Sequence, residues 1–282
     1  MKKTILKIIV ILLVLLIFGV LFKYTATPHG GLTVCFIDVG QGDSAFVSAD
    51  GYNILIDGGV KTTAKEVTAV LDRYGVKTLD LVIASHIDSD HIGGIARVMR
   101  NYNVNSFVTA KTDESLKGEN DIVRQDLLSA LNKTGIGYVS SGDRYTFDKL
   151  TVDIISPDRE FGNANDDSVV AKLSYGERSF LFMGDVSSKV EKAILQNGCD
   201  INADVLKVSH HGSHSSTSGA YLSAVDPRYA VVSVSAHNSY NLPNHEVMQR
   251  LYDYGCEVLR TDESGTITVR SDGTNIDVST EK

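Results

Sequence analysis

Short hydrophobic runs alternate with stretches of helical spacing along most of the chain. Alternating apolar positions are typical of strands, and apolar residues three or four apart are typical of helices. Strands are predicted over residues 32–39, 44–48, 52–56, 79–84, 104–109, 137–140, 151–156, 168–175, 179–183, 203–208 and 229–235. Helices are predicted over 60–74, 94–101, 121–132, 187–197, 218–225 and 243–254, and a final hairpin over 257–278. This alternation predicts an α/β fold with helices outside stacked sheets.

The start of the chain carries a basic segment and then an apolar one. Lysines precede the run 8–22, which is apolar apart from Gly19. With residues 4–6, the segment just reaches the roughly 17 residues that a short membrane-spanning helix needs. We predict a single-pass signal anchor over residues 1–30; the alternative is a signal peptide that is cleaved, so that the rest is secreted. In both cases the positive-inside rule places residues 31–282, predicted as one domain, outside the cytoplasm.

Composition narrows the classes of function. The 282-residue chain has a formal net charge of −8 and 43% hydrophobic residues, enough for one large domain. The acidic balance argues against a general nucleic-acid coat, although bound metals can reverse the local field around a phosphate. Cys35, Cys199 and Cys256 include no C-x-x-C pair, so we interpret them as buried thiols, with one disulfide as the alternative in an exported protein.

The strongest chemical signal follows the predicted strand over 79–84. Residues 86–91 read H-x-D-x-D-H, and Gly93-Gly94 leads into the next helix. Imidazole and carboxylate groups are ligands for zinc or manganese. Four such groups at the end of a buried strand would repel one another or stay unsatisfied without a cation. The stretch therefore predicts a metal site formed by His86, Asp88, Asp90 and His91.

Two further strand ends carry polar residues of the same kind. Asp185 follows the predicted strand over 179–183, and His210 with His211 follows the one over 203–208. Because the C-terminal ends of adjacent strands lie on one edge of a sheet, we expect these loops to converge there. The combined set suffices for two metal ions, with Asp185 between them. Two ions about 3.5–4 Å apart would polarise a scissile bond and activate a hydroxide for attack.

The ordered set of motifs resembles the metallo-β-lactamase fold superfamily, specifically its ComEC-like branch, which is similar to the extracellular domain of a DNA-uptake protein. The matching stretches are 36–47 (FIDVGQGDSAFV), 54–59 (ILIDGG), 84–94 (ASHIDSDHIGG), 165–173 (NDDSVVAKL), 180–186 (FLFMGDV), 206–216 (LKVSHHGSHSS), 238–247 (NSYNLPNHEV) and 265–273 (GTITVRSDG). The resemblance implies an αββα sandwich with a two-metal site along one edge.

The resemblance also implies roles for single residues. His86 and Asp88 would bind the first metal and Asp90 and His91 the second, with Asp185 bridging. We interpret His211 as the remaining ligand and His210, with Asp90, as catalytic, His210 stabilising the transition state or donating a proton. Asp88 stands where many members have His, and the ComEC-like branch shares this Asp. A carboxylate in place of an imidazole makes manganese as plausible as zinc. No His stands at 163–167, so the first site is either weaker or completed by Asn165 or Asp166.

Other residues are candidates for substrate contact or for support of the ligands. Relatives often have a His near 240–245, where this chain reads YNLPNH, so His245 could substitute for it. The remaining candidates are Asp57, Asn165, Lys207 and Ser213. Gly40-Gln41-Gly42-Asp43 lacks the Lys and Ser/Thr of a P-loop, and we interpret it as a hairpin turn whose glycines let it approach the site.

These observations predict an extracytoplasmic metal-dependent hydrolase with two divalent ions, zinc or manganese. The expected substrate is a phosphodiester, in its most specific version DNA. One alternative is a choline-phosphate esterase or another small-molecule phosphodiesterase. Another is a metal- or DNA-binding module without catalysis. The membrane is an expected partner through the N-terminal segment, and the sequence indicates no protein partner.

Overall fold

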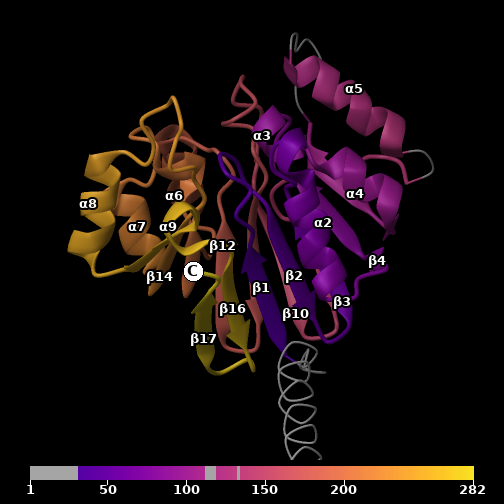
Figure 1. The fold of residues 1–282 in the computed structure, drawn as a ribbon. Coiled ribbons are helices and arrows are strands. Elements are labelled where there is room, and N and C mark those ends of the chain that lie inside the picture. The colour runs from indigo at the N-terminus through magenta and orange to yellow at the C-terminus, as the bar shows by residue number, and fades with distance from the viewer. Residues whose placement is uncertain (1–30, 112–118, 132–133) are drawn as a thin grey trace, which may run out of the picture. The chain divides into compact units, whose positions relative to one another are not determined.

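The computed structural model describes residues 31–111, 119–131 and 134–282 (Figure 1). The predicted membrane anchor over residues 1–30 lies outside this part of the chain. Among the helices that the described residues form, none is both long and apolar enough to cross a membrane. The fold is therefore described from Gly31 to Lys282, which form one compact unit.

The first sheet combines an antiparallel half with a parallel half. Its strands are β1 (Leu32–Phe36), β2 (Ala45–Ala49), β3 (Tyr52–Ile56), β5 (Leu81–Ala84), β7 (Phe107–Ala110), β8 (Gly137–Val139), β16 (Ile267–Ser271) and β17 (Ile276–Thr280). Their order is β17-β16-β1-β2-β3-β5-β7-β8. The strands from β3 to β8 pair in parallel, because helices connect them and return the chain to the same end of the sheet.

The second sheet has the same mixed plan. Its strands are β9 (Arg144–Phe147), β10 (Leu150–Ser156), β11 (Val170–Tyr175), β12 (Arg178–Phe182), β13 (Val205–Lys207), β14 (Tyr229–Val232) and β15 (Glu257–Arg260). Their order is β15-β14-β13-β12-β11-β10-β9. The strands from β12 to β15 pair in parallel. A separate short ladder joins β4 (Thr78–Leu79) to β6 (Asn103–Val104).

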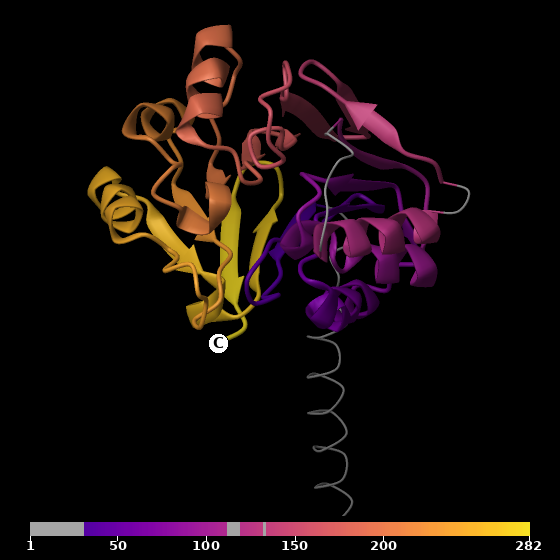
Figure 2. The same cartoon turned by 90° about the horizontal axis from the view of Figure 1, so that it is seen from above.

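Helices cover the outer face of each sheet, so the sheets pack against each other in the middle (Figures 1 and 2). The first sheet is covered by α2 (Ala64–Arg73), α3 (Ser89–Ile92), α4 (Ile95–Asn101) and α5 (Glu119–Leu131). The short turn η1 (Lys61–Thr63) leads into α2. The second is covered by α6 (Ser188–Asn197), α7 (Gly219–Val225) and α8 (His245–Tyr254). The short α9 (Thr261–Ser264) leads from β15 back to β16 in the first sheet.

Three apolar layers hold these elements together. Side chains from both sheets fill the central layer, where Phe36 and Phe182 stack with ring centroids 5.6 Å apart. Successive strand residues point to opposite faces, so on β1 Val34 faces the central layer while Cys35 faces the helices. Both faces are therefore buried, which explains why these strands appear in the sequence as nearly continuous apolar runs.

The structure corrects several sequence-based expectations. The final hairpin was predicted over 257–278, but residues 257–260 form β15 in the second sheet, and the hairpin consists of β16 and β17 in the first. The strand predicted over 104–109 is divided into β6 and β7, and the exposed edge strand β9, which has a weak apolar pattern, was missed.

The face that α5 buries also differs from the prediction. Ile122 is 66% exposed and Leu128 37% exposed, whereas Leu127 and Leu131, also in the predicted stripe, are buried. Val123 completes the buried face because it lies four residues before Leu127, one helical turn away. The cysteines agree with the interpretation as thiols: all three are free, Cys35 and Cys256 buried and Cys199 partly buried.

Candidate metal centre

The predicted ligands come together at one end of the sandwich, but from two sheets rather than one. His86 follows β5 of the first sheet, and Asp185 follows β12 of the second. His210 and His211 lie in the 3-10 turn η2 (Ser209–Gly212), directly after β13. Because β12 and β13 are parallel neighbours, their C-terminal ends meet, and face-to-face packing of the sheets brings β5 to the same place.

The loops are joined by short backbone contacts. Asp43 N donates to Asp90 O at 3.1 Å. A Cβ on Gly42 would lie 2.2 Å from Asp90 O, so only glycine permits this approach. Gly94 likewise packs against Gly58, where a Cβ would lie 2.1 Å from the Gly58 carbonyl oxygen. The predicted close approach of the 40–43 turn is thus a feature of the structure.

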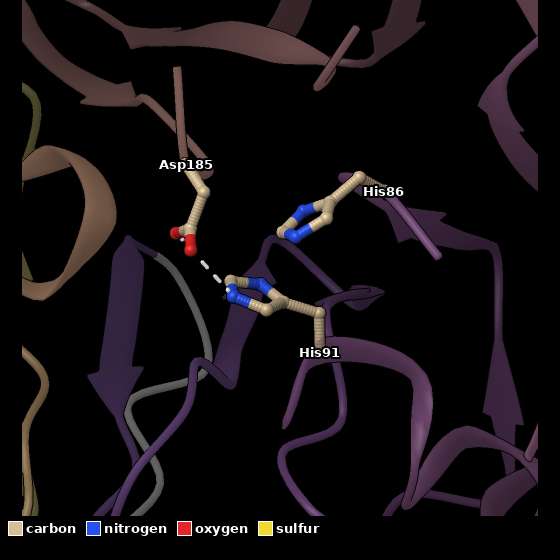
Figure 3. A group of neighbouring side chains, drawn as sticks. All are labelled: His86, His91 and Asp185. Atoms are coloured by element: carbon tan, nitrogen blue, oxygen red, sulfur yellow. Dashed lines mark ion pairs between the residues drawn. The ribbon is translucent and has the colours of Figure 1, made fainter. Parts of the chain in front are cut away.

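One group of ligands consists of His86, His91 and Asp185 (Figure 3). The two imidazole rings have centroids 4.1 Å apart, and His91 Nε2 lies 3.3 Å from Asp185 Oδ1. Asp88 joins from the side, with its Oδ2 3.7 Å from His86 Nε2. All three residues of the group are buried.

A second group consists of Asp90, His91 and His211. His211 Nε2 lies 3.3 Å from Asp90 Oδ2 and 3.6 Å from Asp185 Oδ2. Asp185 therefore directs one oxygen to His91 and the other to His211. Asp185 is thus a member of the first group and lies next to His211 of the second.

The donor set fits a bound cation. His86 Nε2, His91 Nε2, His211 Nε2 and Asp185 Oδ1 are buried and have no hydrogen-bond partner. Buried polar atoms without a partner cost free energy, and here they converge in groups whose ligand atoms lie within 4.8 Å of one another. Imidazole nitrogens and carboxylate oxygens suit zinc or manganese.

The charges of the site are strongly coupled. Burial disfavours the charged form of His91, but Asp185 and Asp57 outweigh it and raise the pKa of His91 well above its usual value. Burial also disfavours the charged form of His211, but Asp185 and Asp43 outweigh it and raise the pKa of His211 to about 10. Burial raises the pKa of Asp90, but His211 and His91 lower it to about 2 overall. A cation would take the place of these protons.

Comparison with known proteins places this chain in a family. The sequence profile of the metallo-beta-lactamase superfamily matches residues 37–237. The chain belongs to the metallo-β-lactamase superfamily. ComE operon protein 3 of Bacillus subtilis is 31% identical over 271 residues, 89% of this chain and 34% of that protein. Competence protein ComA of Neisseria gonorrhoeae is 31% identical over 258 residues, which are 90% of this chain and 34% of that protein. The predicted ComEC-like branch is thus confirmed, and the chain spans about a third of these relatives' length.

Solved structures of the superfamily share the fold. The metallo-beta-lactamase fold protein YhfI of Bacillus subtilis gives a TM-score of 0.58 at 12% identity, covering 86% of this chain and 100% of that one. The metallo hydrolase Igni18 of Ignicoccus hospitalis gives a TM-score of 0.55 at 18% identity, and the match covers 84% of this chain and 98% of that one. At such identities the likeness concerns the fold alone, and it confirms the predicted αββα sandwich.

Two of the candidate ligands, His91 and His211, have buried groups behind their rings. His91 Nδ1 lies 2.9 Å from Asp57 Oδ2, and Ser85 donates to both oxygens of Asp57. His211 Nδ1 donates to the Ser233 carbonyl at 3.0 Å and lies 3.2 Å from Asp43 Oδ1. Asp57 thus sits where support of the metal loop was expected. The sequence pattern places Asp43 in a turn and predicts no role for it. A carboxylate beside the glycines that follow a strand could have indicated a residue close to the site.

His210 differs from the other three imidazoles at the site. Its side chain is 30% exposed, and its Nε2 lies 3.6 Å from Asp185 Oδ2. His210 and His211 both have left-handed backbone angles, with φ of 50° and 52°. The rings stand almost perpendicular, at 75°, so the turn directs His211 into the protein and leaves His210 at the surface of the site. Burial lowers the pKa of His210.

The remaining candidates lie around the site or away from it. Lys207 is buried and paired with Asp43 at 2.7 Å, which leaves it inside rather than facing a substrate. Asp166 accepts from Ser187 N and belongs to no metal-ligand group among the described residues. His245 is exposed in the first turn of α8, where it lines a shallow hollow with α7. Asn165 and Ser213 are partly buried in loops, and their roles stay predictions.

Proposed function

We propose that the chain is a metal-dependent hydrolase that cleaves phosphodiesters. The observation that carries the proposal is the convergence of four buried ligand atoms, each without a hydrogen-bond partner, from loops of both sheets. In this proposal His86, Asp88 and Asp185 hold one divalent ion, and Asp90, His91 and His211 hold a second that shares Asp185. Two such ions, zinc or manganese, would polarise the scissile bond and activate a water molecule.

The protein's own residues have separate tasks in this proposal. Asp185 is shared in this proposal because it groups with His86 of the first site, while its Oδ2 lies 3.6 Å from His211 Nε2 of the second. His210 is the partly exposed imidazole at the centre, so it is placed to donate an N–H to a substrate oxygen or to the leaving group. The left-handed backbone at 210 and 211 is a strained conformation of the kind found at functional sites.

The substrate class is inferred from the relatives and from the charge of the chain. Relatives are named for competence and, in Haemophilus influenzae, for recombination, which points to DNA. The net charge of −8 argues against a long basic footprint on DNA, so a small phosphodiester such as a choline-phosphate ester is the second candidate. The basic and apolar segment within residues 1–30 supports membrane attachment, with the hydrolase outside the cytoplasm.

The test uses the full chain, purified in mild detergent and loaded with zinc or manganese separately. Bis-p-nitrophenyl phosphate, single-stranded DNA and double-stranded DNA are offered as substrates. We expect metal-dependent turnover of the small ester and of DNA. Asp90→Ala should lower the turnover by more than the roughly 10–100-fold that is typical when a residue supporting a metal ligand is removed. Asp277→Ala, which removes an exposed carboxylate on β17, is the matched control.

Each outcome decides between the candidates. Turnover of the small ester alone would exclude DNA and assign the second candidate. Salt-dependent DNA binding without cleavage would indicate a module without catalysis. No turnover with either metal would overturn the proposal.

A further inference from the structure

A buried ion pair lies behind His211 and has no part in the function proposed so far. Lys207 is 3% exposed and Asp43 is 5% exposed, and Lys207 Nζ lies 2.7 Å from Asp43 Oδ2. Lys207 also donates to the Val208 carbonyl at 2.9 Å. Lys207 ends β13 of the second sheet, whereas Asp43 precedes β2 of the first. The pair therefore connects the two sheets directly beneath the candidate metal centre.

The other oxygen of Asp43 faces the ring of His211. Asp43 Oδ1 lies 3.2 Å from His211 Nδ1, the nitrogen that also donates to Ser233 O. The opposite nitrogen, Nε2, faces Asp90 and Asp185. Acceptors at Nδ1 keep the proton on that nitrogen, which leaves the Nε2 lone pair directed at the ligand groups.

Stability alone does not account for this pair. Removing two charges from water costs several kcal/mol per ion by general estimate, and an apolar pair of similar volume is often as stable. The cavity enclosed by Asp43, Asp57 and Lys207 measures only about 10 Å³, so protein groups rather than bulk water surround the carboxylate. What an apolar pair could not supply is a negative charge beside His211 Nδ1, since the Ser233 carbonyl that accepts from this nitrogen is neutral.

We propose that Asp43 is a positioning residue for His211, and that Lys207 holds Asp43 in place. Lys207 fixes one oxygen of the carboxylate, and the other oxygen, together with the Ser233 carbonyl, holds the Nδ1 side of the imidazole. His91 has a corresponding partner in Asp57, which Ser85 holds. This inference rests on the proposed function in one respect, namely that His211 Nε2 is a metal ligand.

The test measures metal affinity rather than hydrolysis. Full-length protein is titrated with Co²⁺, and binding is followed by its visible absorption and by competition with a chelator. Asp43→Asn keeps the volume of the side chain but lets its amide donate toward Nδ1. We expect Co²⁺ affinity to fall by roughly 10–100-fold. The matched control is Asp200→Asn, which removes the acidic partner of another buried lysine, Lys172, at 2.8 Å in the same sheet, and should leave the affinity unchanged.

A double variant separates positioning from charge balance. If Asp43 only neutralises Lys207, then Asp43→Asn with Lys207→Met removes both charges and should restore wild-type Co²⁺ affinity, which would overturn the proposal. If Asp43 positions His211, the double variant stays weakened.

The single variant carries a second readout in case the double variant does not fold. Ring-¹⁵N NMR of the Zn²⁺ form should show a slowly exchanging Nδ1 proton on His211 in the wild type and faster exchange in Asp43→Asn. Identical exchange would contradict the proposal. Failure of the wild type to bind Co²⁺ would instead overturn the proposed function.

Discussion

Asp57 Oδ2 lies 2.9 Å from Nδ1 of His91, while the other ring nitrogen of His91 faces Asp185. The carboxylate thus sets which His91 nitrogen is free for a ligand role. In Asp57→Asn the amide would donate to Nδ1 and shift the ring proton to Nε2. We expect metal affinity to fall roughly 10–100-fold, measured by Zn²⁺ competition with a chelator. Ser85→Ala keeps the backbone donor to Asp57, so its metal affinity should fall less than that of Asp57→Asn. An equal loss of affinity would contradict the idea that Asp57 sets the tautomer of His91.

Metal binding should stabilise the folded chain through Asp185. A ligand that binds only the native state stabilises it by about 2.7 kcal/mol at 100 times its Kd. We therefore expect Zn²⁺ to raise the thermal unfolding midpoint and EDTA to reverse the shift. Asp185→Asn removes the charge that both ions share in the proposed function, so most of the shift should disappear. A shift of wild-type size in this variant would show that the ion binds elsewhere.

Two glycines of the same turn should respond differently to substitution. Both have positive φ, 71° at Gly40 and 126° at Gly42. A Cβ on Gly40 would meet nothing within 4 Å, whereas one on Gly42 would collide with the Asp90 backbone. Gly40→Ala should cost about 1–2 kcal/mol of unfolding free energy, and Gly42→Ala about 1–3 kcal/mol more, measured by urea unfolding. Metal affinity should fall only for Gly42→Ala, since that collision displaces Asp90.

A hydrogen bond between the two sheets should give a pH-dependent contribution to stability. The Tyr175 hydroxyl donates to Asp50 Oδ2 at 2.8 Å, and this bond is the main cause of the lowered pKa of Asp50. A lowered carboxyl pKa stabilises the fold above the ordinary value of 3.8, and the gain is lost as pH falls through the folded-state pKa. Its size is about 1 kcal/mol.

Urea unfolding of wild type and Tyr175→Phe checks this contribution. The difference between the two proteins should be present near pH 6 and should shrink as the pH falls below 3.8, the ordinary pKa of an aspartate. A difference that does not change with pH would mean that the ring packing of Tyr175, rather than the charge of Asp50, is responsible.

The sequence by itself determined most of the elements and the candidate metal loop. The spacing in 86–91 and the polar residues after 183 and 208 are local features, because an apolar strand followed by a turn defines where each side chain emerges. The ordered motifs also indicated the superfamily, which the profile match confirms.

Only the tertiary structure decided how the strand ends meet. The ligands were expected on adjacent strands of one sheet, but they come from two sheets that face each other. Which sheet β15 joins depends on pairing with β14, a long-range contact that no local pattern specifies. The role of Asp43 was likewise hidden, since Lys207 and His211 lie more than 160 residues away in the chain. Burial of this carboxylate between the sheets, rather than its place in a turn, gives it its partners.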